Sequence, residues 1–433
     1  MEAFGPMNDI ILKAYKTELD PNNVQRSIFK RYAWVSAAVY NTMLREWEHV
    51  YDITGKSGSI YEIRKRFNAV KDDICPWART APYGVTESAA LNLGRAIDNF
   101  FRQRKDGTVD KRVAKMKANG TWARHYAKCS ERGKAGIRAL PGYPKEKRYL
   151  DSFQFRGLKV RGNEIYIART GWIRLKEHNY IPLSTSGLKF ATYATVKLHA
   201  GRWFISAQVY EPRPQINDHH DLVVGVDFGI KDLAICSTGK VFENPHPLRE
   251  AQKKLRRLQR ELSRRKKGGQ NWKKTRAKLQ KQHRRVANIR RYTLHEISSY
   301  LTKEVRPSII VLEDLNVEGM KSNHCLAQAI SDAGFAELRR QIEYKADWYG
   351  SYVLLADRWE PSSKRCSGCG YKRENLSLAD RTFNCPSCGL IIDRDLNAAY
   401  NLRNIGERFL GIHNEPLNER GLPRELGRSN ASL

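Results

Sequence analysis

The chain has 433 residues and is strongly basic, with 77 Lys and Arg against 46 Asp and Glu and a net charge of +31. An excess of this size points to a polyanionic partner. No stretch reaches the roughly 18 consecutive apolar residues of a membrane-spanning helix, and the basic residues are spread along the chain instead of lining one amphipathic helix. Twenty Tyr and nine Trp can stack on bases. The composition therefore favours nucleic acid over a membrane as the partner.

The first half of the chain changes from a helical to a strand-like pattern. Residues 10–19 have the composition of a short strand, and apolar residues three or four apart between 24 and 47 predict a helix, with Asp20 well placed to start it. A second helix is predicted over 86–104, and the stretch 102–147 is polar and basic with little period. Alternating apolar residues between 153 and 205 predict short hairpin strands. We expect a small β-barrel that carries a helical insertion.

The second half of the chain has an α/β pattern. Two apolar segments, 222–227 and 309–314, predict buried strands that end in carboxylates, and 233–236 predicts an antiparallel neighbour of the first. The sequence also predicts a helix over 332–349, a strand over 352–355 and a helix that opens near Asp395. The last stretch, 411–433, is polar and without pattern, and we expect a tail. With 41% hydrophobic residues the chain can bury more than one core, so two to four domains are expected.

A very basic helical hairpin is predicted over 251–300, with its turn at Gly268 and Gly269. Between positions 253 and 291 there are eighteen Lys or Arg and a single acid, Glu261. Such a run is often only a solvated face or a disordered segment. Here Leu255 and Leu258 begin an apolar stripe with helical spacing, which favours ordered helices that present cations to phosphates. The predicted nucleic-acid-binding residues are Arg256, Arg257, Arg260, Arg264, Arg265, Lys273 and Lys274.

Three acids, Asp227, Glu313 and Asp395, are the predicted catalytic residues. Two end apolar strands that we expect to be neighbours in one sheet, and the third opens a helix packed on that sheet; ligand sites collect at such strand ends. Converging carboxylates repel one another unless a cation neutralises them. A pair of Mg²⁺ about 3.5–4 Å apart can activate water on one side of a phosphodiester and stabilise the leaving oxygen on the other. Taken singly, each acid could instead be a turn residue or a helix cap.

Four cysteines, Cys366, Cys369, Cys385 and Cys388, follow the pattern C-x2-C-x15-C-x2-C. The alternative reading is a disulfide pair or chance, but two knuckles at this spacing are typical of one tetrahedral zinc. Because thiolates fill all four positions, the predicted zinc is structural and not catalytic. The remaining cysteines are scattered singly and no apolar signal stretch follows Met1, which favours a reducing cytoplasm.

Several of these segments together resemble a known family. The segments Gly225-Val226-Asp227-Phe228-Gly229-Ile230-Lys231 and Val311-Leu312-Glu313-Asp314-Leu315, the cysteine ribbon, and Asp393-Arg394-Asp395-Leu396-Asn397-Ala398-Ala399 are similar to the split RuvC-like nuclease of TnpB, the RNA-guided endonuclease encoded by bacterial insertion sequences. The segment from Ile330 to Gly350 is also like that family. The resemblance covers residues 221–405 strongly and the first half only in architecture. The family pattern Asp-x-Asn-Ala-Ala points to Asp395 as the third ligand, with Asp393 in a supporting or structural role.

The resemblance implies a multidomain fold that combines α+β and α/β parts. It implies a wedge β-barrel at 1–21 and 146–218, a helical recognition domain at 22–145, an RNase H-like (RuvC) nuclease domain at 219–360 and 391–412, a zinc ribbon at 361–390 and a polar tail at 413–433. It further implies one guide RNA per protein chain, double-stranded and single-stranded DNA targets, and cleavage of both strands at one two-ion Mg²⁺ site beside a short flanking motif. In such nucleases the protein recognises the flanking motif and the backbone, and base pairing selects the sequence.

The sequence leaves three alternatives open. A compact type V CRISPR effector shares the nuclease, the ribbon and the acids, and only the genomic neighbourhood would separate it. A nuclease-inactive, RNA-guided DNA-binding regulator would have lost an acid, whereas all three are present. A DNA-strand-transfer transposase also uses an RNase H-like fold, but its third carboxylate is usually a Glu on a helix with no ribbon before it.

Overall fold

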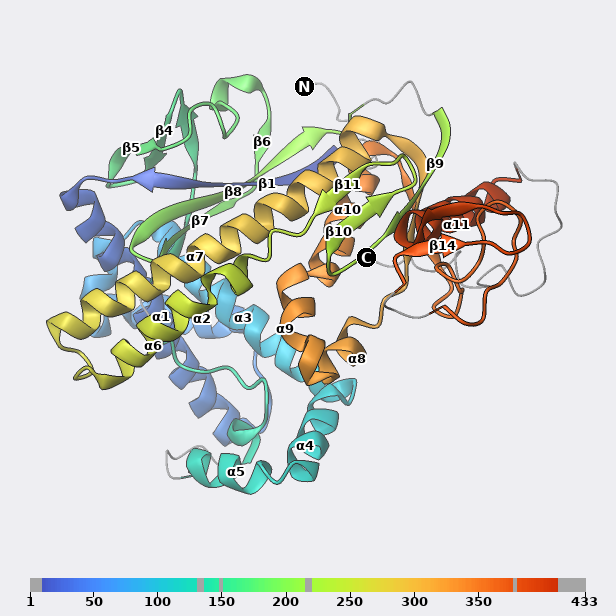
Figure 1. Cartoon of the computed structure of the whole chain (residues 1–433). Coiled ribbons are helices and arrows are strands. Elements are labelled where there is room, and N and C mark those ends of the chain that lie inside the picture. The colour runs from blue at the N-terminus through green and yellow to red at the C-terminus, as the bar shows by residue number, and fades with distance from the viewer. Residues whose placement is uncertain (1–9, 131–135, 148–150, 215–219, 377–379, 412–433) are drawn as a thin grey trace. The chain divides into compact units, whose positions relative to one another are not determined.

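The computed structural model describes residues 10–130, 136–147, 151–214, 220–376 and 380–411 (Figure 1). The chain divides into two compact units, Met1–Pro212 and Arg213–Leu433. The predicted polar tail at 413–433 lies outside the described residues. Within the described residues no helix is both long and apolar enough to cross a membrane.

The first unit is built on one antiparallel sheet. Its strands are β1 (Ile10–Asp20), β2 (Ser152–Arg156), β3 (Lys159–Arg161), β4 (Glu164–Ile167), β5 (Gly171–Leu175), β6 (Lys189–Phe190), β7 (Tyr193–His199) and β8 (Arg202–Pro212). They are ordered β2-β7-β8-β1-β5-β4-β3, with β6 on β8. The N-terminal strand is thus a central member, paired with β8 from Ile10 to Leu19.

The sheet of the first unit is open. In the described part of the chain β2 and β3 end the hydrogen-bonded path and do not pair with each other, so the expected barrel is not closed. Alternating apolar residues predict strands, but closure depends on pairing between the two edge strands. Helices α1 (Asn23–Thr54) and α3 (Tyr83–Lys105) instead contact the edge strand β2.

The helical part of the first unit holds more helices than its pattern predicted. Helices α1 and α3 contain the two predicted segments, and α2 (Ile60–Ile74), α4 (Thr108–Ala118) and α5 (Trp122–Ser130) are additional. The prediction that Asp20 starts the first helix is wrong. Asn22 is the N-cap, and its side chain and that of Gln25 form a reciprocal capping box, whereas Asp20 is paired with Arg174 in the sheet.

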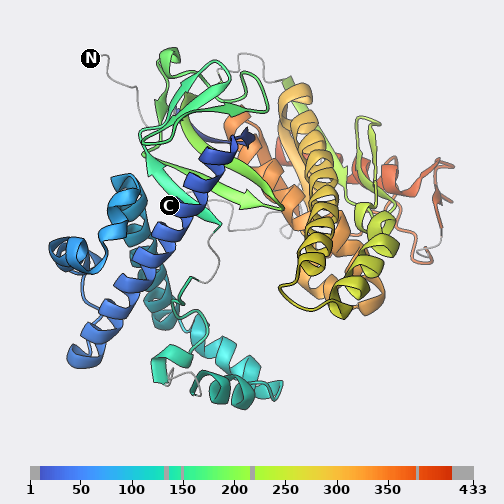
Figure 2. The ribbon, with the colours of Figure 1, turned by 90° about the vertical axis from the view of Figure 1, so that its left-hand side faces the viewer.

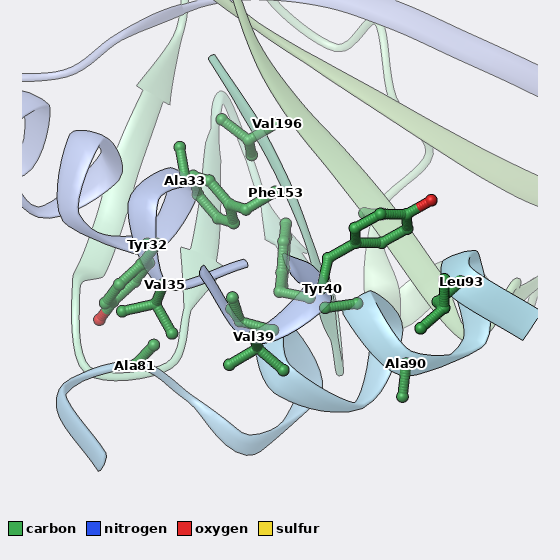
Figure 3. Close-up of a cluster of buried hydrophobic side chains, with 14 of the residues drawn as sticks. Tyr32, Ala33, Val35, Val39, Tyr40, Ala81, Ala90, Leu93, Phe153 and Val196 are labelled. Atoms are coloured by element: carbon green, nitrogen blue, oxygen red, sulfur yellow. The ribbon is translucent and has the colours of Figure 1, made fainter. Parts of the chain in front are cut away.

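One core joins the helices and the sheet of the first unit. Tyr32 and Val39 of α1 and Leu93 of α3 are buried against strand residues that include Phe153 and Val196 (Figure 3). Tyr32 and Phe153 meet edge to face with their ring centroids 5.4 Å apart. Burial of such large side chains stabilises each by about 1.5–3 kcal/mol relative to exposure.

The second unit is built on a mixed five-stranded sheet, ordered β11-β10-β9-β12-β13. The strands are β9 (His220–Asp227), β10 (Asp232–Cys236), β11 (Val241–Glu243), β12 (Pro307–Glu313) and β13 (Tyr352–Ala356). Strand β12 is parallel to both β9 and β13, and β10 is antiparallel to β9. The predicted strands and the expected neighbours β9 and β12 are confirmed.

Helices cover both faces of this sheet. They are α6 (Pro247–Arg264), α7 (Gln270–Ser299) with a π-helical end (Tyr300–Val305), α8 (Val317–Ser322), α9 (His324–Ala333), α10 (Phe335–Tyr349) and α11 (Arg394–Phe409). Val224 and Ile310 pack in a core with α7, α9 and α10, whereas their neighbours Val223 and Ile309 pack with Leu402 of α11. Alternate residues of a strand point to opposite faces, so the two cores lie on the two sides of the sheet.

The helix predicted over 332–349 is broken in the structure. Gly334, with φ of 75°, ends α9, and α10 begins at the next residue. A residue in this left-handed conformation cannot continue an α-helix. The side chain of Asp332, which precedes the break, is buried, accepts a hydrogen bond from the backbone N–H of Leu248 at the start of α6 (2.9 Å) and pairs with Arg290 of α7 (2.6 Å).

Candidate active site and zinc ribbon

Asp227 and Glu313 lie at the same edge of the second sheet. Each is the last residue of its strand, and the parallel register places Val226 opposite Leu312, one residue before the two acids. The apolar runs that precede them are buried in the sheet, so the backbone delivers both carboxylates to the end of neighbouring strands. This is the arrangement that the sequence predicted.

Asp395 is brought toward the same edge by the close packing of α11 on β9 and β12. A Cβ added at Gly225 of β9 would collide with the backbone oxygen of Ala399 and the backbone nitrogen of Arg403. A Cβ added at Gly406 would lie 2.5 Å from Val223 and 2.7 Å from a side-chain carbon of Val311. Glycine at both positions therefore allows the helix backbone to approach the sheet.

The neighbouring acid Asp393 has a different place in the structure. Its side chain is the N-cap of α11 and accepts hydrogen bonds from the backbone N–H groups of Asp395 (2.9 Å) and Leu396 (3.0 Å). A capped helix start fixes the backbone from which the carboxylate of Asp395 projects.

Electrostatics show that the three carboxylates lie close enough to repel one another. Burial, followed by repulsion from Glu313 and Asp395, raises the pKa of Asp227 well above its ordinary value. Burial and the charge of Asp395 also raise the pKa of Glu313, against the lowering effect of a hydrogen bond that Ser362 Oγ donates to it (2.6 Å). Partly buried acids that repel one another favour a cation among them.

The carboxylate of Asp395 is held by neighbouring arginines. Arg394 donates from Nε and Nη2 to Asp395 Oδ1 (3.0 and 2.9 Å), and Arg381 Nη1 lies 3.8 Å from the other oxygen. Among the described residues, the four cysteines have ligand atoms that all lie within 4.8 Å of one another, and the three acids do not form such a group. The donor chemistry nonetheless fits a hard divalent cation, because all three groups offer carboxylate oxygens in a repelling cluster.

The four cysteines meet in the ribbon as predicted. Their sulfur atoms all lie within 4.8 Å of one another, with Cys366 and Cys388 3.6 Å apart and Cys369 and Cys385 3.5 Å apart. Sulfurs at the corners of a tetrahedron around zinc are about 3.8 Å apart when each bond is about 2.3 Å. The cysteine geometry therefore fits one tetrahedral zinc.

The ribbon is attached to α11 by asparagine side chains. Asn397 and Asn401 both donate to the backbone oxygen of Arg365, each at 2.6 Å, and Asn397 accepts from the backbone N–H of Ser367 at 2.9 Å. Asn401 also donates to the backbone oxygen of Ser362 (2.7 Å). Both asparagines are buried. The ribbon is thus hydrogen-bonded to the helix that carries Asp395. The Asn-Ala-Ala motif in the sequence did not by itself reveal these contacts.

Two cavities adjoin Glu313, of about 380 and 150 Å³. Arg358 lines both and pairs with Asp314 (2.5 Å), and Arg339 of α10 lines the larger one and also pairs with Asp314 (3.0 Å). Sequence reasoning missed these arginines and Ser362, because they come from loops and helices distant in sequence.

The predicted basic hairpin is present. Helices α6 and α7 run side by side and are joined through Gly268 and Gly269 (Figure 2). Arg265 differs from the other predicted contacts, because it is half-buried and pairs with Glu261 (2.5 Å), which also accepts from Thr275 of α7 (3.0 Å). The remaining six predicted residues are exposed: Arg256, Arg257, Arg260, Arg264, Lys273 and Lys274.

The second unit defines a class of protein. It has a mixed sheet with carboxylates at the ends of two neighbouring strands. A third carboxylate lies at the start of a packed helix, and a cysteine ribbon is inserted before that helix. These features together define a RuvC-like domain of the RNase H type. The fold agrees with a solved structure titled "Cryo-EM structure of the Cas12f1-sgRNA-target DNA complex" at a TM-score of 0.50 and 17% identity, over 88% of this chain and 83% of that one.

Family models match three parts of the chain. The model described as "Probable transposase" (OrfB) matches residues 206–324, "Cas12f1-like, TNB domain" matches 335–402, and "Helix-turn-helix domain" matches 7–56. In the structure, the described part of this last segment comprises β1 and α1.

Several relatives cover most of the chain. One, from Streptomyces pristinaespiralis, is named "Putative RNA-guided DNA endonuclease" and is 40% identical over 333 residues, which are 74% of this chain and 77% of the relative. Another, from Escherichia coli K12, is named "Putative RNA-guided DNA endonuclease InsQ" and is 29% identical over 92% of this chain and 93% of its own length. The chain belongs to the TnpB (OrfB) family.

Proposed function

We propose that this protein is a transposon-encoded, RNA-guided endonuclease that hydrolyses phosphodiester bonds of double-stranded DNA beside a short flanking motif. The observation that carries the proposal is the convergence of Asp227, Glu313 and Asp395 at one edge of the RuvC-like sheet. The names of the two relatives support the same activity. The net charge of +31 suits a protein that holds RNA and DNA together.

The three acids are the proposed ligands of Mg²⁺ and the catalytic residues. A pair of Mg²⁺ bound there would activate water and stabilise the leaving oxygen of an in-line displacement. Ser362 orients the Glu313 carboxylate through its hydrogen bond, and Arg394 balances the charge of Asp395. The cysteines of the ribbon would hold one structural zinc, and through Asn397 the ribbon fixes the helix that carries Asp395.

The domain assignments made from the sequence are part of the proposal. The wedge at 1–21 and 146–218 and the recognition domain at 22–145 would bind the guide RNA and the flanking motif, with one protein chain per guide RNA. The nuclease domain at 219–360 and 391–412, interrupted by the ribbon at 361–390, would cut the DNA. The six exposed cations of the hairpin would contact phosphates as duplex or single strands pass the nuclease domain.

A compact type V CRISPR effector is a second candidate. The match of residues 335–402 to a Cas12f1-like domain favours it, although the relatives that cover most of the chain favour the transposon-encoded protein. The neighbourhood of the gene decides between the two, through either an insertion-sequence end or a repeat array.

The proposal is tested by sequencing the RNA that copurifies with the full chain and then offering duplex DNA matched to it. We expect one RNA species, with cutting of the matched duplex in Mg²⁺ and none with EDTA or with an unmatched duplex. Cutting that ignores the sequence of the bound RNA, or that persists in EDTA, would contradict the proposal.

A further inference from the structure

Trp359 is the most exposed large hydrophobic side chain among the described residues, with 86% of its surface accessible. It lies in the loop that leads from β13 to the ribbon. A single exposed hydrophobic residue is common on protein surfaces. Two features distinguish Trp359 from such isolated surface residues. One is its position in the chain, and the other is the set of contacts that hold its backbone.

The loop that carries Trp359 is fixed on both sides. Its backbone N–H donates to Asp357 Oδ1 (2.8 Å), and the next N–H, of Glu360, donates to the Asp357 backbone oxygen (3.0 Å). Glu360 is in turn paired with Arg365 (3.2 Å). The exposed indole therefore projects from an ordered backbone.

The same loop is tied to the acid site on either side of the indole. Arg358, the residue before Trp359, donates to the backbone oxygen of Asp314 (3.2 Å) and pairs with its carboxylate. Ser362, three residues after Trp359, donates to the carboxylate of Glu313 (2.6 Å). Both flanks thus contact the strand end that delivers Glu313, so the backbone of Trp359 is held close to that strand end.

The chemistry around this loop fits one kind of occupant. Arg358 and Arg339 line the larger cavity next to Glu313, where both also pair with Asp314, and guanidinium groups can bind phosphate. An exposed indole that follows Arg358 in the chain provides a platform for an unpaired base, and every base has a face that can stack. We propose that Trp359 stacks on an unpaired nucleobase of the DNA strand being cut and thereby positions the adjacent phosphate over the three acids. This inference rests on the proposed nuclease function.

The test uses the full chain with its copurified RNA and measures single-turnover cleavage of matched duplexes. One target is intact, and the others each carry one abasic site, moved in single steps past the cut position. We expect Trp359→Ala to slow cleavage of the intact target about tenfold, with target binding unchanged and with most of the rate restored in Trp359→Phe. Because the side chain is exposed, the substitution leaves the core intact.

The abasic targets identify the stacked base. At one position the abasic site should lower the cleavage rate of the wild type about tenfold. At the same position Trp359→Ala should cut the abasic and intact targets at equal rates, because the variant has already lost the stacking contact. Ile391→Ala removes another exposed side chain, 72% accessible and located between the ribbon and α11, and should behave as wild type.

Two results would overturn this inference and leave the proposed nuclease function standing. In the first, Trp359→Ala cuts as fast as a fully active wild type. In the second, Trp359→Ala is slower but responds to every abasic position as the wild type does. The second result would mean that the indole contacts something other than a base, such as a protein surface. A wild type that cuts no matched target would overturn the proposed nuclease function itself, and this inference with it.

Discussion

The acid site and the basic hairpin belong to the same unit but are built in opposite ways. At the acid site the helix backbone touches the sheet at Gly225, and buried asparagines fix the ribbon. In the hairpin, cations stand exposed over a thin apolar stripe that includes Leu255 and Val286. Metal chemistry depends on exact ligand positions, whereas phosphate attraction acts at a distance and is shared among many groups. Single substitutions should therefore have large effects in the first region and small effects in the second.

The largest effect is expected from Asp395→Ala. Loss of a proposed metal ligand should lower the cleavage rate by about 10³-fold or more while target binding persists. Asp393→Ala is the matched control, because it removes a helix cap worth about 1 kcal/mol and should slow cleavage less than about tenfold. Rates on a matched duplex and footprinting of the bound target separate the two. An active Asp395→Ala with an inactive Asp393→Ala would overturn the assignment of the third ligand.

The ribbon cysteines are expected to give the next largest effect. Cys366→Ser or Cys388→Ser should release zinc and lower cleavage by about 10²-fold, because the helix that carries Asp395 loses its support. Elemental analysis should find one zinc in the wild type and less in the variants. Cys325→Ser, at an exposed cysteine outside the cluster, should keep both zinc and activity. An active wild-type protein without zinc would contradict the assignment.

The close contact between α11 and the sheet predicts a large loss of stability for a small change. Gly225→Ala places a methyl group against the backbone of α11 and should lower the free energy of unfolding of this unit by about 3 kcal/mol or more. Gly368→Ala is the control, since its added carbon would make only contacts of 3.6 Å or longer. Denaturant unfolding of the two variants measures the difference. Equal stability would mean that the helix is not packed as closely as the structure shows.

The smallest effect per residue is expected in the hairpin. Replacing Arg256, Arg257, Arg260 and Arg264 by Gln should flatten the dependence of log affinity on log salt by about three to four units on duplex DNA. Matched and mismatched targets should weaken alike, because phosphate contacts carry no sequence information. Arg265→Gln should leave the slope nearly unchanged, since that residue is engaged with Glu261. An unchanged slope in the quadruple variant would mean that the hairpin is a solvated face.

The sequence predicted every strand of the five-stranded sheet except β11, and the edge at which Asp227 and Glu313 meet, because a buried strand that ends in an acid has a distinctive local pattern. It did not predict α4 and α5. In α5 no residue is buried and in α4 only Val109 is, so these helices have little apolar period to detect. The contacts of Ser362 and Asn397 join segments far apart in sequence, and no local pattern reports such partners.

One carboxylate site is proposed to cut both DNA strands. The most direct measurement is strand-resolved, single-turnover cleavage of a guide-matched duplex by Glu313→Gln in Mg²⁺, with each strand labelled separately. The substitution keeps the shape of the side chain and removes its charge, so the complex with the target should form normally. Cutting of both strands should be lost together. Continued cutting of either strand at the wild-type rate would contradict the assignment of both cuts to one site.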